Sequence, residues 1–233
     1  MDGDRWQCTG CARNGSWRLR YAVVVMLGTC AFVAGPLFAQ QATTGALSED
    51  NNKKEWSFSL AASGYIVPND RSYASPIFTA DRQRLHLETR YNDEDKETAS
   101  LWVGYNLSAG SKLVFEATPM LGGVFGNTSG VAPGGRLSLT YKRVRLSSEV
   151  EYVFDIVDSH KSFLYSWNEL VYSATDWFHA GLVSQRTRAY HTSLDVQRGV
   201  SVGFSHKKVD FTTYVFNAGW TDPTIVLVLG FNF

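Results

Sequence analysis

Cysteine is almost absent from this chain of 233 residues, and its three copies, Cys8, Cys11 and Cys30, all lie near the start. The rest of the chain has none, which excludes a disulfide-stapled scaffold and leaves a large sheet or core as the source of stability. Long apolar runs are missing as well. From residue 55 onward there is no run of 18 apolar residues and no 3.6-residue apolar period, and alternating segments separated by turn residues occur instead. The architecture is therefore predicted to be all-β.

A strong charge of one sign is also lacking, because Lys and Arg number 22 and Asp and Glu number 22. Beyond residue 39 the balance becomes 18 basic to 20 acidic residues, since four arginines (5, 13, 18, 20) and two aspartates (2, 4) lie before that point. No basic stripe with interleaved aromatic residues occurs. The sequence therefore gives no indication of nucleic-acid binding.

The first 39 residues are interpreted as a secretory signal with an extended N-terminus. Arg18 and Arg20 precede an apolar core from 21 to 33, and a cleavage region ends at Ala39. The core is too short and too interrupted for a membrane span of about 20 residues. Residues 40–54 are polar and are predicted to form a flexible leader, and residues 55–233 to form one domain.

Alternating polar and apolar residues predict twelve strands in this domain. Eleven patterns are clear, and a twelfth at 73–80 contains Pro76, which removes a hydrogen-bond donor from the ladder. The predicted strands are 56–66, 73–80, 84–91, 100–107, 112–118, 137–141, 144–154, 162–173, 177–188, 197–205, 209–217 and 223–233. Short links near 108, 142, 175 and 207 alternate with longer loops near 92, 122, 156, 189 and 219. The glycine-rich stretch 122–135 is interpreted as a long loop, and the two faces of 162–173 cannot be told apart.

The last strand is the most specific pattern in the sequence. One apolar stripe falls at every second residue and ends on the last residue of the chain: Ile225, Leu227, Leu229, Phe231 and Phe233. This resembles the C-terminal signal strand of bacterial outer-membrane β-barrel proteins of the porin-like superfamily. The resemblance implies a closed antiparallel transmembrane β-barrel in the bacterial outer membrane, with twelve strands favoured and ten as the alternative. It also implies that this stripe is read by the barrel-assembly machinery.

Alternation alone does not distinguish a membrane barrel, apolar outside, from a soluble lipid-binding barrel, apolar inside. The polar face here is largely Ser, Thr, Gly, Asn and Gln, whereas a soluble exterior is normally rich in Lys and Glu. Aromatic residues near strand ends, such as Tyr91, Tyr105, Tyr141 and Trp177, suit the interfacial girdles of a membrane barrel. These features favour contact with outer-membrane lipid.

Charged residues on the polar faces are the candidate functional residues. The expected lumen set is His86, Glu88, Arg90, Glu116, Arg136, Arg145, Glu149 and Glu151. Charges in a low-dielectric wall should pair or meet water. Two interpretations remain open: a charged constriction that selects solutes by size and sign, and a salt-bridged plug that holds a narrow barrel together. The plug is favoured because little sequence is left for constricting loops.

Catalytic, metal and cofactor sites are not expected. Asp158, Ser159 and His160 are triad-type residues, but neighbours on one loop rarely reach the converging geometry that a triad needs. The histidines show no metal-ligand spacing, and the glycine-rich stretch is not followed by a helix, as a phosphate-binding loop requires.

The expected function is passive. We expect a monomeric barrel that forms a narrow pore for small hydrophilic solutes or has a mainly structural role. The alternatives are a binding or adhesion module that acts through the loops at 122–135 and 189–193, and, less favoured, a soluble lipid-binding barrel.

Overall fold

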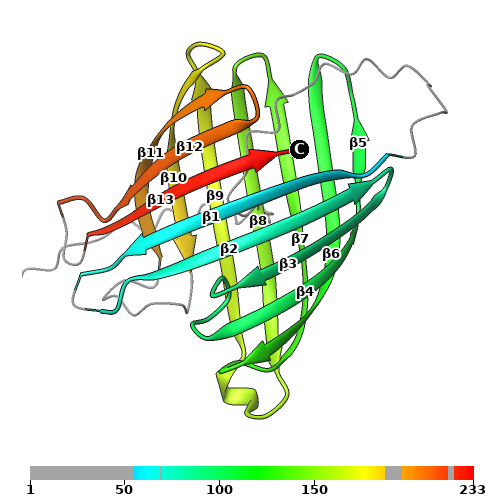
Figure 1. Ribbon diagram of the computed structural model, residues 1–233, viewed down its shortest axis with the longest axis vertical. Helices are drawn as coiled ribbons and strands as arrows, with labels where there is room; N and C mark the ends of the chain where they lie inside the picture. Colours follow the sequence, from blue (N-terminus) through cyan, green and yellow to red (C-terminus); the bar gives the residue numbers. More distant parts are fainter. Residues whose placement is uncertain (1–54, 69, 187–195, 220–222) are drawn as a thin grey trace, which may run out of the picture. The chain divides into compact units, whose positions relative to one another are not determined.

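The computed structural model describes residues 55–68, 70–186, 196–219 and 223–233. The predicted signal (1–39), the predicted leader (40–54) and the loop at 189–193 lie outside the described residues. The described part is built almost wholly from antiparallel strands (Figure 1). In chain order, the strands are β1 (Ser57–Ile66), β2 (Tyr73–Arg82), β3 (Leu85–Tyr91), β4 (Thr98–Tyr105), β5 (Leu107–Ala109), β6 (Leu113–Gly126), β7 (Gly130–Tyr141), β8 (Val144–Asp155), β9 (Phe163–Ser173), β10 (Phe178–Arg186), β11 (Gln197–His206), β12 (Val209–Phe216) and β13 (Thr224–Asn232).

The strands close into a barrel. Strands that follow one another in the chain pair with each other, except that β4 and β5 both pair with β6, and β1 pairs with β13. Leu107 faces Ala117 in the same register in which Gly104 faces Met120, so β5 continues β4 beyond Asn106. If β4 and β5 are counted as one strand, the barrel wall has twelve strands, which confirms the predicted count. The segment with Pro76 is one of them, β2.

The first and last strands hold the barrel closed through a long ladder. Pairing runs from Ser59 opposite Asn232 to Ile66 opposite Ile225. The backbones of Phe58 and Phe233 then exchange two hydrogen bonds of 3.1 and 3.0 Å. The strand predicted from the apolar stripe thus fills the seam, and closure leaves no unpaired edge in the sheet formed by the described strands.

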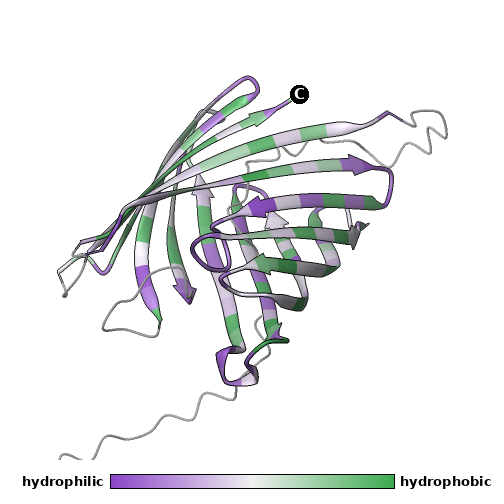
Figure 2. Ribbon diagram, turned by 60° about the horizontal axis from the view of Figure 1, so that its bottom comes forward, coloured by the Kyte–Doolittle hydropathy of each residue, from purple (hydrophilic) through white to green (hydrophobic). Residues whose placement is uncertain are grey.

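Apolar side chains lie on the outside of the barrel. The stripe residues Ile225, Leu227 and Leu229 are 37–38% exposed, whereas Val226 between them is fully buried. The same alternation runs along the other strands, where bands of opposite hydropathy follow one another (Figure 2). The orientation is the reverse of a soluble lipid-binding barrel, whose apolar residues face inward.

The glycine-rich stretch 122–135 is not a loop, and this part of the prediction was wrong. It forms the end of β6 and the start of β7, joined by a turn at 127–129. The glycines make room for large neighbours on the inward face. A Cβ on Gly122 would lie 2.5 Å from the ring of Trp102, and a Cβ on Gly134 would lie 2.8 Å from the Cβ of Glu151. The adhesion alternative therefore has no long loop at this position on which to act.

The two ends of the barrel differ. At one end the strands are joined by the turns 83–84, 110–112, 142–143, 174–177 and 207–208, and the chain enters β1 and leaves β13 at the same end. We call this the short-turn end. At the opposite, long-loop end lie the described connections 92–97, 127–129 and 156–162, and at this end β1, β10 and β12 finish and β2, β11 and β13 begin. The alternation matches the predicted links near 142, 175 and 207 and the predicted loops near 92 and 156, whereas the loop predicted near 122 is the short turn 127–129.

Helix is confined, in the described ranges, to one 3₁₀ turn, η1 (Ser159–Lys161). The Asp158 carboxylate caps this turn by accepting a hydrogen bond of 3.1 Å from the backbone N–H of His160. Asp158, Ser159 and His160 thus form a capped turn and not a converging triad. None of the described residues belongs to a helix long and apolar enough to cross a membrane.

Candidate functional site

Arg90 is the centre of a charged network in the barrel lumen. Its side chain projects inward from β3 and is nearly fully buried, as the alternation of β3 predicts. The guanidinium contacts five carboxylates: Glu88, Glu149 at 2.5 Å, Asp93 at 2.9 Å, Glu151 at 3.0 Å and Glu94 at 3.8 Å. A buried guanidinium with this many acidic partners is stabilised as a cation, because it has exchanged its water for charge-assisted hydrogen bonds.

Arg136 on β7 is the second cation of the network. Its Nη2 lies 2.6 Å from Glu88, and its Nε donates to Glu149 at 3.1 Å. Glu88 and Glu149 therefore each bridge both arginines. Shared partners make the four side chains one interacting unit whose members are expected to depend on one another.

The indole ring of Trp102 on β4 packs against the guanidinium of Arg90. The guanidinium carbon lies 4.6 Å from the centre of the indole ring, within the range of a cation–π contact. The indole N–H also lies 3.1 Å from Glu94 and 2.9 Å from Ser100. Gly122 on the neighbouring strand gives the ring its space.

The network crosses the lumen. Arg90 lies on β3, and its partners Glu149 and Glu151 lie on β8. Strands β4, β6 and β7 separate β3 from β8 in the barrel wall. The contact is therefore made through the interior and not between neighbouring strands.

The loop 92–97 folds inward to complete the network. Asp93 and Glu94 are 3% and 0% exposed although they lie between two strands. The loop is held at its ends by backbone bonds from Asn92 to Thr98 and from Asn127 to Glu97. Burial raises the pKa of Asp93 to about 7, with Arg90 acting in the opposite direction. Burial also raises the pKa of Glu94.

A second polar group joins the network on the side of the short-turn end. His86 lies 2.8 Å from Asp81 and 3.3 Å from Glu88. Asp81 also accepts a hydrogen bond of 2.6 Å from Asn106, at the break between β4 and β5. Hydrogen-bonded polar groups thus continue from the charged network toward the short-turn mouth.

Aromatic side chains fill another part of the lumen. The ring of Trp167 on β9 packs edge-on against Tyr214 and Phe216 of β12, at centroid distances of 5.1 and 5.4 Å. The indole N–H donates to Glu169 at 3.0 Å. This settles the ambiguous strand: Tyr165, Trp167, Glu169 and Val171 face inward. The lumen therefore contains a charged sector and an aromatic sector.

The structure brings six of the eight candidate lumen residues together: His86, Glu88, Arg90, Arg136, Glu149 and Glu151. Arg145 and Glu116 also occupy inward-facing positions of β8 and β6 but stand apart from the network, and Glu116 accepts a hydrogen bond of 2.8 Å from Ser138. Sequence reasoning missed Asp93, Glu94 and Trp102. A run of charged residues between two strands normally indicates a solvated loop, so the sequence contained no signal for the first two.

The network is not arranged as a metal site. Within the described ranges no group of three His, Cys, Asp or Glu side chains is placed to hold a metal ion. The carboxylates converge on guanidinium groups instead.

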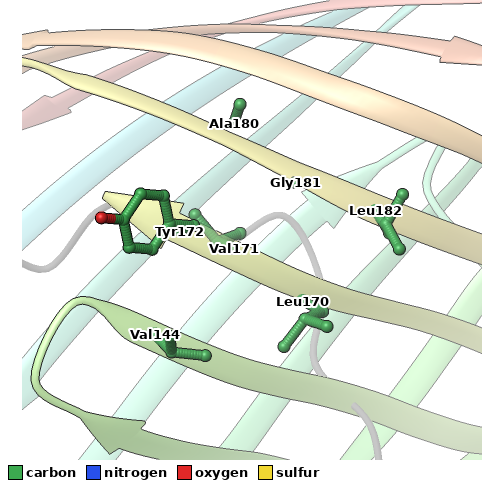
Figure 3. A pocket seen from close by; sticks show the side chains of 7 residues that line it. All are labelled: Val144, Leu170, Val171, Tyr172, Ala180, Gly181 and Leu182. Carbon is green, nitrogen blue, oxygen red and sulfur yellow. The ribbon is translucent and has the colours of Figure 1, made fainter. Parts of the chain in front are cut away.

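A shallow depression of about 400 Å³ lies between β8, β9 and β10 (Figure 3). It surrounds the small residue Ala180, which interrupts a surface of larger apolar side chains that includes Leu170, Tyr172 and Leu182. These three side chains are 45–60% exposed, so the depression belongs to the outer face. It offers no charged group for chemistry.

We expect the docking of the loop 92–97 into the lumen to depend on pH. The pKa of Asp93 rises from an ordinary value of 3.8 to about 7 on docking, so the docked loop binds the proton more tightly than a released loop would. Docking should therefore be most stable near pH 4 and weaken as the pH rises to 7. The charged groups that face Asp93 are Glu88, Arg90, Glu94, Glu149 and Glu151, with Tyr165 nearby.

Hydrogen exchange of the 92–97 amides, corrected for intrinsic rates, measures this directly. We expect stronger protection at pH 5 than at pH 8, and a smaller difference in Asp93→Asn, which cannot ionise. Equal protection at both pH values in the unaltered protein would contradict the expectation.

Comparisons with known proteins inform the fold. No known family matches the sequence, and no curated protein does. Among solved structures, the fold is similar to that of "KdgM porin in complex with disordered oligogalacturonate", with a TM-score of 0.52 and 10% sequence identity. The similarity covers 75% of this chain and 99% of that chain. At this identity the similarity establishes the fold alone: the chain shares the closed antiparallel β-barrel fold of that porin.

Proposed function

We propose that this barrel lies in the bacterial outer membrane and acts as a narrow passive pore for small hydrophilic solutes. The observation that carries the proposal is a closed barrel whose outer face is apolar and whose lumen is lined in part by charged and hydroxyl side chains. A barrel of this orientation needs lipid outside and tolerates water inside.

The outer face supports the membrane location. Exposed Leu, Val and Phe side chains surround the barrel, and aromatic residues lie near the strand ends, with Tyr91, Tyr105 and Tyr141 all 45–49% exposed. In water this surface would be an aggregation hazard. By the usual arrangement of bacterial barrels, the short-turn end would face the periplasm.

The lumen supports a small solute. Arg90 reaches across to β8, and Trp167 reaches from β9 to β12, so both sectors reduce the free cross-section. The solved porin of similar fold is in complex with an oligogalacturonate, which is a hydrophilic solute. From that complex we apply to this protein only the expectation that the solute is hydrophilic.

A structural barrel with a closed lumen is the second candidate. The same cross-lumen contacts favour it, because a salt-bridged interior can brace strands that are not neighbours in the wall without leaving a continuous path. Flux through the purified protein distinguishes the two candidates.

Liposome swelling is the test. Vesicles that contain the folded protein should swell in glycerol and in a pentose, and much more slowly in a disaccharide. Vesicles with the same amount of heat-unfolded protein should not swell. If the folded, inserted protein admits none of these solutes, the pore is wrong and the structural barrel is supported.

We further propose that the stripe Ile225, Leu227, Leu229, Phe231 and Phe233 is the signal read by the barrel-assembly machinery, and that the barrel functions as a monomer. The stripe is exposed on β13, and the Phe233 ring stacks on Phe58 at a centroid distance of 5.9 Å. Light scattering of the purified protein in detergent tests the monomer, and a mass of two or more chains would contradict it.

Changing Phe233 to Asp should reduce the amount of folded barrel in the outer membrane several-fold, because the apolar signal is lost. Asn127→Asp, which introduces the same negative charge in an exposed turn, should have little effect. The readout is the heat-modifiable band in membrane fractions. Refolding of both variants in detergent, without the machinery, separates recognition from stability: if Phe233→Asp also fails there, the residue is structural and the signal interpretation is wrong.

A further inference from the structure

Acidic side chains predominate on the inward-facing positions of the described strands. Eight carboxylates occupy such positions: Asp81, Glu88, Glu116, Glu149, Glu151, Asp155, Glu169 and Asp210. Three arginines occupy them: Arg90, Arg136 and Arg145. The inward loop adds Asp93 and Glu94. The full sequence has equal numbers of acidic and basic residues, so the surplus belongs to the lumen and not to the composition.

Basic residues are concentrated elsewhere. The turns of the short-turn end contain Arg84, Lys112, Lys142, Arg143, Lys207 and Lys208, and each of these side chains is exposed. Charges at such positions are screened by salt beyond about 8–10 Å. Charges inside a narrow lumen are screened much less, so the lumen set should dominate the choice of ion.

The arginine network does not neutralise the whole acidic set. Arg90 and Arg136 contact Glu88, Glu149 and the other carboxylates around the centre of the lumen. Nearer the short-turn mouth, Glu116 accepts its hydrogen bond from Ser138, and Asp210 accepts from Ser205 and Thr212. These donors are neutral hydroxyl groups, so they stabilise a carboxylate without cancelling its charge. Arg145, the third inward-facing arginine, lies at the start of β8 near the same mouth. The described inward-facing positions at this mouth therefore carry Asp81, Glu116 and Asp210 against one arginine.

Asp81, Glu116 and Asp210 form an acidic ring around this mouth. They lie on β2, β6 and β12, which are well separated in the barrel wall, and each is close to the short-turn end of its strand. Asp81 is linked to His86, and Glu116 is exposed to solvent. Rings of Asp and Glu side chains select cations by attracting them and repelling anions.

We propose that the lumen conducts cations in preference to anions, with Glu116 and Asp210 of the acidic ring as the residues that set this preference. The inference rests on the proposed pore and names its solute class. An anionic solute of the kind seen in the KdgM complex would meet repulsion at this mouth.

The test is the reversal potential of the full-length protein in planar bilayers of uncharged phosphatidylcholine, under a tenfold KCl gradient at pH 8. We expect K⁺ permeability to exceed Cl⁻ permeability several-fold. Glu116→Lys should lower the permeability ratio at least twofold, and Asp210→Asn should lower it by a smaller factor.

Asp176→Lys is the matched control, since it makes the same charge change in an exposed turn at the same end of the barrel. It should leave the ratio unchanged. Heat-modifiable mobility verifies that each variant is folded, and Glu116→Gln replaces Glu116→Lys if the lysine variant does not insert, with a smaller shift in the same direction.

The outcomes separate this inference from the pore itself. Conductance with a permeability ratio at or below one overturns cation preference and leaves the pore standing. Equal shifts in Glu116→Lys and Asp176→Lys overturn the role of the acidic ring. A folded, inserted protein without conductance overturns the pore and this inference with it.

Discussion

A guanidinium that leaves water must be surrounded by acceptors, and Arg90 meets this constraint by gathering carboxylates from across the lumen. Its partners come from β3, from the loop 92–97 and from β8, so one side chain ties together parts of the barrel that the backbone ladder does not join. A buried arginine left without these acids would be strongly destabilising. The position of the loop and the distance between β3 and β8 across the lumen therefore depend on it.

Two glycines leave the space that the side chains around Arg90 need. Glycine at 122 gives the Trp102 ring room beneath the guanidinium, and glycine at 134 gives the backbone of Glu151 room to approach β7. Two residues that weaken a strand in isolation are thus placed where bulky or charged neighbours need space. The cost in strand propensity is offset because closure of the barrel holds β6 and β7 between paired neighbours.

Much of the fold could be predicted from local pattern, because the period of two fixes the face of each residue. His86, Glu88 and Arg90 were placed inward by alternation with Leu85, Leu87 and Tyr91, and the stripe ending at Phe233 indicated the closing strand. The signal segment remains a prediction, since it lies outside the described residues.

Other features could not be predicted, because they depend on contacts between residues far apart in the chain. Glycines at 122 and 134 look like loop residues until the ring and carboxylate beside them are known. Strand β9 has large apolar residues on both faces, and only the aromatic sector opposite it shows that Trp167 points inward. In the sequence, Asp93 and Glu94 look like residues of a solvated loop, and only their contacts with Arg90 show why they are buried. The contact through the lumen between side chains of β3 and β8 leaves no pattern in the sequence of either strand.

A double-mutant cycle between Arg90 and Glu149 tests this cross-lumen link most directly. The free energy of unfolding would be measured by urea titration in lipid vesicles for the unaltered protein, Arg90→Met, Glu149→Gln and the double variant. The account predicts a coupling free energy of about 1.5–3 kcal/mol, because the two side chains are buried partners in one network. Effects that add within about 0.5 kcal/mol would show that the walls are not joined in this way.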